Sequence, residues 1–241
     1  SYSDIPASTG LGSSSAFTVG LVKALCALQK KPMTKKKISE IASKIEVDLV
    51  KRRIGRQDHY ATCYGGLNHI IFFKDDSVKV RKITISEKNK KKLENSLALV
   101  YTNMKRNADK VLSHQYKPNK DQSKYLLSMK KDVYEFKKIL SKEKIEINEI
   151  GKFLIKQWSL KKKINKISTK KIDKMYDKLI SLGAYGAKLL GAGQGGFLLL
   201  LSNKNVQKKI KNNFKLKNFI KIRFDNDGSK FVYRSENFIK D

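Results

Sequence analysis

A glycine- and serine-rich stretch near the start of the chain, Gly10–Ser15, constrains the fold most, because a helical pattern follows it directly. Apolar residues then recur at the spacing of one helix face: Phe17, Leu21, Ala24, Leu25 and Leu28. The first amides of a helix have no intrahelical partner and carry the positive end of the helix dipole. Glycines let an anion approach the backbone, so the stretch predicts a phosphate-binding loop. The alternative is a glycine-serine turn that caps an ordinary helix.

A second glycine-rich stretch, Gly191–Gly196, lies between two apolar segments that we expect to be strands, Ala187–Leu190 and Phe197–Leu201. It has four glycines in six residues. Each glycine costs about 0.5–1 kcal/mol of backbone entropy relative to alanine in regular structure. A tight turn needs fewer glycines, so close approach to a ligand is the favoured explanation.

Asp58 is the candidate catalytic carboxylate, because it lies among small and aromatic residues between two glycine turns. The alternative is that it caps the helix that begins there. Two further carboxylates precede Asp58: Glu46, twelve residues before it, and Asp48, ten residues before it. From the residues alone, Glu46 would be a solvated helix carboxylate.

The two glycine-rich stretches resemble motifs of the GHMP kinases, the galactokinase, homoserine, mevalonate and phosphomevalonate kinases. Pro6 and the residues to Ala16 resemble the second motif, Pro-x3-Gly-Leu-Gly-Ser-Ser-Ala, with Ser15-Ala16 in place of a double alanine. Gly191–Gly196 resembles the third motif, with Gln194 where relatives usually have glycine. Gln57-Asp58 resembles the segment whose aspartate faces the acceptor hydroxyl, with His59 in place of the usual glutamine.

Within that family the residues resemble the D-glycero-D-manno-heptose 7-phosphate kinases. The resemblance implies transfer of phosphate from ATP to the anomeric C1 hydroxyl of the sugar phosphate, for surface polysaccharide precursors. Alternatives are another sugar 1-kinase (fucose, galactose or N-acetylhexosamine type), or a truncated, non-catalytic nucleotide-binding relative. Expected ligands are ATP, Mg²⁺ and a sugar or sugar phosphate.

The resemblance also assigns roles to individual residues. It places the ATP phosphates at Gly10, Leu11, Gly12, Ser13, Ser14 and Ser15, and beside the third-motif loop at Gly191, Ala192, Gly193, Gly195 and Gly196. It implies that Asp58 is the base, and that Ser14 (or Ser13) and Glu46 bind magnesium. The twelve residues between Glu46 and Asp58 are close to the separation of the family's magnesium-binding glutamate from its aspartate, and Asp48 is the rival ligand. Candidates for binding the sugar phosphate are Asp58, Gly65, Arg106, Lys161 and Lys188.

The implied fold class is α+β, a GHMP kinase fold. Residues 1–88 would form the second half of an ATP-binding domain that resembles ribosomal protein S5 domain 2, and residues 89–241 a ferredoxin-like C-terminal domain. The family has a further N-terminal segment that this chain is expected to lack.

Local patterns predict the other elements. Thr34 is expected to cap a helix whose apolar stripe includes Ile38 and Leu49, and residues 69–73 and 78–85 are expected to form a hairpin. The polar segment 86–92 is the expected domain junction, and residues 115–124 are loop-like. Further elements are strands at 97–101, 219–224 and 230–233, and helices with stripes over 126–140, 147–158, 172–179 and 205–214.

Composition bounds the partners of the chain. The net charge of +31 over 241 residues suggests nucleic acid. The lysines, however, are spread through the chain without the aromatic interleaving of single-strand binders. We therefore expect no nucleic-acid partner. No apolar run approaches the roughly 20 residues that a membrane helix needs, so we expect no membrane partner and a cytoplasmic protein. A homo-oligomer is left open. Cys26 and Cys63 are expected to be reduced.

Overall fold

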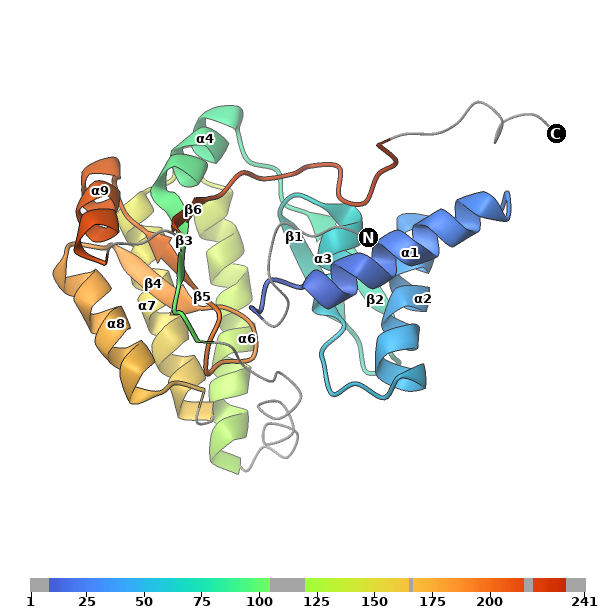
Figure 1. Ribbon diagram of the computed structural model, residues 1–241, viewed down its shortest axis with the longest axis horizontal. Coiled ribbons are helices and arrows are strands. Elements are labelled where there is room, and N and C mark those ends of the chain that lie inside the picture. Colours follow the sequence, from blue (N-terminus) through green and yellow to red (C-terminus); the bar gives the residue numbers. More distant parts are fainter. Residues whose placement is uncertain (1–8, 105–119, 165–166, 215–218, 233–241) are drawn as a thin grey trace. The chain divides into compact units, whose positions relative to one another are not determined.

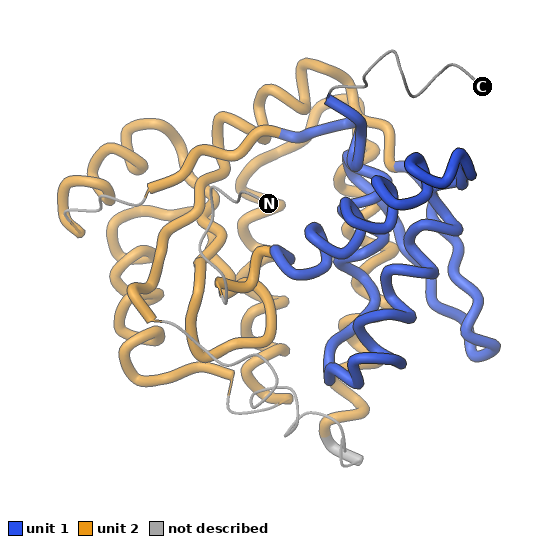
Figure 2. Tube along the Cα trace, turned by 45° about the vertical axis from the view of Figure 1, so that its right-hand side comes forward, with its two compact units in different colours: residues 1–4, 12–82, 224–241 blue, residues 5–11, 83–223 orange. Residues whose placement is uncertain are grey.

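The computed structural model describes residues 9–104, 120–164, 167–214 and 219–232 (Figure 1). Among these, the contacts within the chain define two compact units (Figure 2). Unit 1 contains residues 12–82 and 224–232, and unit 2 contains residues 9–11 and 83–223. The chain thus changes unit between residues 11 and 12, between residues 82 and 83, and again at residue 224. The expected boundary at residues 88 and 89 stays a prediction.

Unit 1 consists of helices and one hairpin. Its elements are α1 (Ser13–Leu28), α2 (Lys35–Lys44), the π-helical segment η1 (Ile45–Leu49), α3 (Gln57–Tyr64), β1 (Asn68–Phe72) and β2 (Val78–Lys82). The predicted cap is confirmed, since the Thr34 side chain accepts a hydrogen bond from the Lys37 amide at the start of α2. The predicted hairpin is confirmed as well, with β1 and β2 paired antiparallel.

The core of unit 1 lies between its helices. The face of α1 that packs in this core is not the face with the largest apolar side chains. The buried residues of α1 are Ser15, Thr18, Val19 and Val22. Val19 and Val22 pack with Ile38, Ala42 and Cys63. The larger apolar side chains of α1, from Phe17 to Leu28, are exposed in unit 1, so apolar spacing locates the helix but not the face that packs on α2 and α3.

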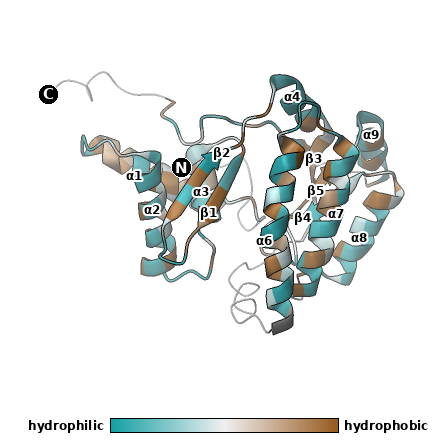
Figure 3. Ribbon diagram, turned by 180° about the vertical axis from the view of Figure 1, so that it is seen from behind, coloured by the Kyte–Doolittle hydropathy of each residue, from teal (hydrophilic) through white to brown (hydrophobic). Residues whose placement is uncertain are grey.

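Unit 2 contains the longer helices and the larger sheet. Its elements are α4 (Glu87–Ser96), β3 (Leu97–Tyr101), α6 (Lys120–Leu140), α7 (Ile147–Ile164), α8 (Lys170–Ser181), β4 (Gly186–Leu189), β5 (Phe197–Leu201), α9 (Lys204–Asn213) and β6 (Phe219–Lys221). Figure 3 shows α6, α7 and α8 lying side by side, with the strands of the sheet behind them.

The sheet of unit 2 has the order β4-β5-β3-β6, and all neighbouring strands are antiparallel. With α9 between β5 and β6 and the helices α6 to α8 between β3 and β4, this is the predicted ferredoxin-like βαββαβ arrangement with additional helices. Alternate residues of the strands, such as Val100 and Leu198, join a core with Trp158 and Ile210. Trp158 thus ends the predicted apolar stripe over residues 147–158 as a buried core residue.

Two predicted boundaries were wrong, and one polar segment proved to be helical. Residues 86–92 contain the N-cap Ser86 and the start of α4, whose buried residues include Asn89; their role as a domain junction stays a prediction. Helix α6 already begins at Lys120, inside the segment expected to be a loop. Residues 230–232 form no strand, and Tyr233 lies outside the described residues.

The described helices were also compared with the requirements for crossing a membrane. None of them combines the necessary length with sufficient apolar character.

Candidate active site

The glycine-rich loop leads directly into α1, as predicted. Gly10 and Gly12 have φ angles of 82° and 73°, in the left-handed region that favours glycine. Gly12 is the N-cap of α1 and makes no side-chain cap, and the first turn carries no acidic residue. The first amides of a helix have no intrahelical partner, so with Gly12 as N-cap these amides and the helix dipole favour an anion there. Binding of ATP phosphates there stays a prediction.

Glu46 is the centre of the polar cluster next to this helix start. It is only 4% exposed. The Ser14 hydroxyl donates a hydrogen bond to Oε1 of Glu46, and the Ser15 hydroxyl donates to Oε2 at 3.1 Å. Asp48, the rival ligand, is exposed, so the fold of unit 1 brings Glu46 and not Asp48 to the serines.

A π-helical turn presents Glu46 in this position. The amide of Val50 donates to the carbonyl of Ile45 at 2.9 Å, five residues back, in the segment that follows α2. Such single π-turns insert one residue into a helix and often occur at functional sites. The predicted helix over this segment therefore ends in a wider turn, and Leu49, expected in its apolar stripe, is exposed.

Two residues that the sequence did not assign to the cluster complete it. The Arg52 guanidinium lies 3.0 Å from Oε1 of Glu46 and 2.5 Å from the Ser14 hydroxyl. Nε2 of His59, which is fully buried, lies 2.7 Å from Oε2 of Glu46. His59, noted in the sequence as a departure from the family motif, thus faces the buried carboxylate. Nothing in the spacing of Arg52 indicated its contact.

The charge of Glu46 is stabilised by these contacts. Burial by itself would raise the pKa of Glu46, but the hydrogen bonds from Ser14, Ser15 and His59, together with the nearby His59 charge, outweigh it and lower that pKa. Glu46 is therefore a carboxylate at neutral pH, which is the form that binds cations.

Asp58 lies in the first turn of α3, whose N-cap is Arg56, so Asp58 is not the cap that the alternative interpretation required. Its side chain lies against the glycine-rich loop. A Cβ added at Gly12 would lie 3.4 Å from Cβ of Asp58 and 3.6 Å from Oδ2. The candidate carboxylate and the start of α1 are thus neighbours in unit 1.

Gly65 ends α3, at the opposite end from Asp58. Seven residues of helix separate the two by about 10 Å. A Cβ at Gly65 would overlap the backbone of Gly228, so this glycine is explained by packing within the chain. Gly65 also lines a hollow of about 760 Å³ beside α1, and Asp58 is not among the residues that line this hollow.

The third-motif loop of unit 2 is held by the backbone around it. The Gln194 amide donates to the Ile167 carbonyl at 2.7 Å, and the Gly196 amide donates to the Met104 carbonyl at 2.9 Å. A Cβ at Gly193 would lie 2.7 Å from the oxygen of Ile167, and one at Gly195 would lie 2.5 Å from that of Met104. Backbone packing accounts for these glycines, and contact of the loop with ATP stays a prediction.

The remaining substrate candidates have different surroundings. The Lys161 ammonium donates a hydrogen bond to the carbonyl of Gly191 at 2.6 Å and so stabilises the third-motif loop. Lys188 is in β4 and partly buried, and desolvation lowers the pKa of its ammonium group. Arg106 lies outside the described residues. Their contacts with a sugar phosphate stay predictions.

The Ser14–Glu46 pair fits the oxygen donors that Mg²⁺ prefers. In the described part of the chain, no three His, Cys, Asp or Glu side chains form a metal cluster. Mg²⁺ is commonly held by one or two carboxylates and by substrate phosphates, so it needs no such cluster. The Arg52 guanidinium lies against the Ser14 hydroxyl oxygen and Oε1 of Glu46, so this position favours positive charge.

Comparisons with known proteins match both halves of the chain. A family model described as GHMP kinases N terminal domain matches residues 1–66, and one described as GHMP kinases C terminal matches residues 142–221. The D-glycero-alpha-D-manno-heptose 7-phosphate kinase of Campylobacter jejuni is 32% identical over 200 residues, which are 82% of this chain and 58% of that protein.

Two further known proteins are similar to the chain. The galactokinase of Pyrococcus furiosus is 29% identical over 230 residues, covering 86% of this chain and 64% of that protein. A D-glycero-D-manno-heptose 1-phosphate kinase from Bacteroides thetaiotaomicron has a similar fold, with a TM-score of 0.68 at 24% identity, over 96% of this chain and 67% of that one. The chain spans less than two thirds of the length of either curated relative.

Proposed function

The chain belongs to the GHMP kinase family, and from this premise we propose that the protein containing it is an ATP-dependent sugar kinase. The two family models together match more than half of the chain, and the predicted GHMP kinase fold is confirmed. The proposed reaction phosphorylates the C1 hydroxyl of D-glycero-D-manno-heptose 7-phosphate to the 1,7-bisphosphate, for surface polysaccharide precursors. The heptose 7-phosphate kinase relative at 32% identity supports this substrate. The proposed location is the cytoplasm.

The observation that carries the proposal is the cluster at the start of α1. Phosphoryl transfer needs positioning and neutralisation of charge more than covalent help. The glycine-rich loop offers unpaired amides and the positive end of a helix dipole, each contact being worth about 0.3–1 kcal/mol at an exposed site. Gly10–Ser15 would hold the ATP phosphates in this proposal, and Gly191–Gly196 would flank them.

Ser14 and Glu46 would hold Mg²⁺ through their side-chain oxygens. When bound, the metal ion would neutralise charge on the phosphate oxygens. His59 and Ser15 hold the Glu46 carboxylate in place by hydrogen bonds of 2.7 Å and 3.1 Å. The Arg52 guanidinium contacts the same two oxygens, so in this proposal it and the metal ion would compete for them.

Asp58 would act as the base. Its carboxylate would accept the proton of the C1 hydroxyl as the sugar oxygen bonds to the γ-phosphorus and the bond to ADP breaks. Its position against Gly12 supports this role, because it places a proton acceptor beside the phosphate-binding loop. Gly65, Arg106, Lys161 and Lys188 remain the proposed contacts of the sugar phosphate.

The second candidate function is a sugar 1-kinase for an unphosphorylated hexose such as galactose, fucose or an N-acetylhexosamine. The galactokinase relative favours it, because 29% identity over 230 residues is close to the value for the heptose kinase. A non-catalytic nucleotide-binding relative is the third candidate.

Phosphorus NMR of the full-length protein with MgATP and D-glycero-D-manno-heptose 7-phosphate tests the proposal. A new anomeric phosphate signal with equal formation of ADP would support both the reaction and its position. Nucleotide binding without turnover on this sugar, but with turnover on a hexose, would favour the second candidate. Absence of nucleotide binding would overturn the kinase proposal.

A further inference from the structure

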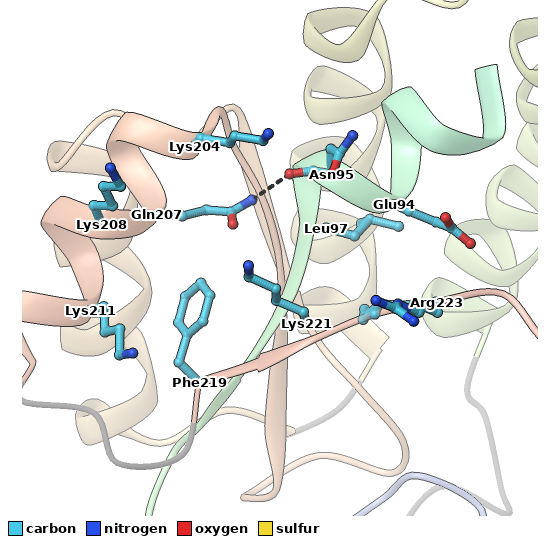
Figure 4. A pocket seen from close by; sticks show the side chains of 11 residues that line it. Glu94, Asn95, Leu97, Lys204, Gln207, Lys208, Lys211, Phe219, Lys221 and Arg223 are labelled. Carbon is cyan, nitrogen blue, oxygen red and sulfur yellow. Dashed lines mark hydrogen bonds between the residues drawn. The ribbon is translucent and has the colours of Figure 1, made fainter. Parts of the chain in front are cut away.

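A groove of about 560 Å³ lies in unit 2 between α9, β6 and the junction of α4 with β3 (Figure 4). Its floor is fixed by Gln207, which is buried and whose side-chain amide donates to the carbonyls of Asn95 at 3.0 Å and Ser202 at 3.3 Å. None of the residues assigned to the candidate active site lines it. The groove is therefore a separate, built feature of this unit.

Two rows of positive charge border the groove. One row follows α9, where lysines at i, i+4 and i+7 share a helix face: Lys204, Lys208 and Lys211. The other row follows β6 and its continuation, where Lys221 and Arg223 line the groove two residues apart. Figure 4 shows the Lys221 side chain reaching from β6 toward α9, beside the ring of Phe219.

These five cations are not compensated within the part of the chain that the structure describes. None of them takes part there in an ion pair or a side-chain hydrogen bond, whereas Lys92, Lys142 and Lys156 each pair with a carboxylate. A single carboxylate, that of Glu94, lines the groove with them. Like charges brought together around a concave surface raise its potential and concentrate anions there.

We propose that this groove binds a small ligand that carries several phosphate groups. Its volume is in the range of small-molecule sites rather than of an extended macromolecular surface. Lysine ammonium groups bind phosphate as point charges, and Arg223 can form bidentate hydrogen bonds to it. Phe219 adds an apolar ring surface at the groove, so both an inorganic polyphosphate and a nucleotide fit this chemistry.

The test is a titration of the ¹⁵N-labelled protein with inorganic tripolyphosphate, without Mg²⁺, followed by amide NMR shifts. Saturable shifts are expected in Lys204–Asn213 and in Phe219–Arg223. The variant K208Q/K221Q should weaken binding at this site about tenfold, because it removes two charge-assisted contacts. The matched control, K170Q/K174Q, removes two exposed lysines of α8 and should change the affinity less than about twofold.

ATP and AMP, titrated in the same way, distinguish the ligand sources. Tighter binding of ATP than of tripolyphosphate at α9 and β6 would assign a nucleotide, and equal binding would assign the polyphosphate chain alone. Equal weakening in the groove variant and the control, or no saturable shift at α9 and β6, would overturn the proposal. So would preferential, steeply salt-dependent binding of a single-stranded RNA oligomer there, since it would indicate a polynucleotide surface.

Discussion

Gly196 and Thr9 are in direct backbone contact in unit 2: a Cβ added at Gly196 would overlap the carbonyl oxygen of Thr9. Thr9 immediately precedes the glycine-rich loop, and Gly196 closes the third-motif loop. The carbonyl of Gly196 also accepts hydrogen bonds from the amide of Thr102 at 2.9 Å and from its hydroxyl at 2.8 Å. Within unit 2, the residue before the glycine-rich loop is therefore packed against the end of the third-motif loop.

The substitution Gly196→Ala should destabilise the protein by about 2–4 kcal/mol, because it combines a backbone overlap with a φ angle that alanine rarely adopts. That φ angle is 92°. The control is Gly20→Ala, in α1, where an added Cβ meets nothing within 4 Å and should stabilise by about 0.5–1 kcal/mol. Urea unfolding followed by circular dichroism measures both. A Gly196→Ala variant as stable as the parent would contradict the packing described.

The substitution Asp58→Asn should lower turnover by about 10²–10⁴-fold and leave ATP binding unchanged, because the amide cannot accept the hydroxyl proton. Asp48→Asn is the matched control, since Asp48 is an exposed carboxylate in the same unit. Steady-state kinetics and nucleotide titration separate the two effects. Near-normal turnover of the Asp58 variant would remove this residue from the proposed role.

The substitution Glu46→Gln should weaken the binding of Mn²⁺, used as a spectroscopic substitute for Mg²⁺, by about 10–100-fold in the presence of ATP. The reason is that the amide keeps the shape of the side chain but loses the charge that Ser14, Ser15 and His59 stabilise. Electron paramagnetic resonance measures free Mn²⁺ without requiring turnover. A larger loss in Asp48→Asn than in Glu46→Gln would transfer the metal role to Asp48.

The substitution His59→Phe should destabilise the protein by about 1–3 kcal/mol, because the buried Oε2 of Glu46 loses the nearer of its two donors and keeps only the Ser15 hydroxyl. His59→Gln restores a hydrogen-bond donor and should cost less than about 1 kcal/mol. Thermal and urea unfolding of the two variants give the comparison. Equal stability of both would show that the contact of 2.7 Å between His59 and Glu46 contributes little.

The substitution Lys188→Met should stabilise the protein at pH 7 by about 1–3 kcal/mol, because it removes a desolvated ammonium group. Desolvation lowers the pKa of Lys188 in the folded state, so the unfolded chain binds more protons once the pH exceeds that folded-state pKa. The free energy of unfolding should therefore rise in the parent as the pH increases toward 10.5, the usual lysine value. Lys188→Met should lose this rise, and Lys174→Met, on the exposed side of α8, should keep it.

Much of the fold could be predicted because local patterns determine it. The turn residues between β1 and β2, the capping Thr34 and the glycine-rich loop before α1 act over a few residues, and each is in its expected place. Helix α4 was missed because a capping serine and one buried leucine, Leu93, replace a full apolar stripe. Ser86 was the local sequence feature that indicated the start of this helix, since its hydroxyl accepts a hydrogen bond from the Asn89 amide.

The candidate site could be predicted only in part. Motif resemblance selected Ser14, Glu46 and Asp58, and the fold brings Ser14 to Glu46. The contacts of Arg52 and His59 with Glu46 depend on how α2, η1 and α3 pack, and residue spacing does not encode that packing. The exposed face of α1 escaped prediction for the same reason, since apolar periodicity does not say which side meets a neighbour.

The π-turn at Ile45–Leu49 has a consequence for the length of this part of the chain. An α-helix turns by about 100° per residue, so one extra residue redirects everything that follows by that angle. A single-residue deletion between Glu46 and Arg52 would let α2 continue as a regular helix, and would carry Arg52 away from the side on which Glu46 lies. Natural variants of this segment should therefore keep its residue count even where they change its residues.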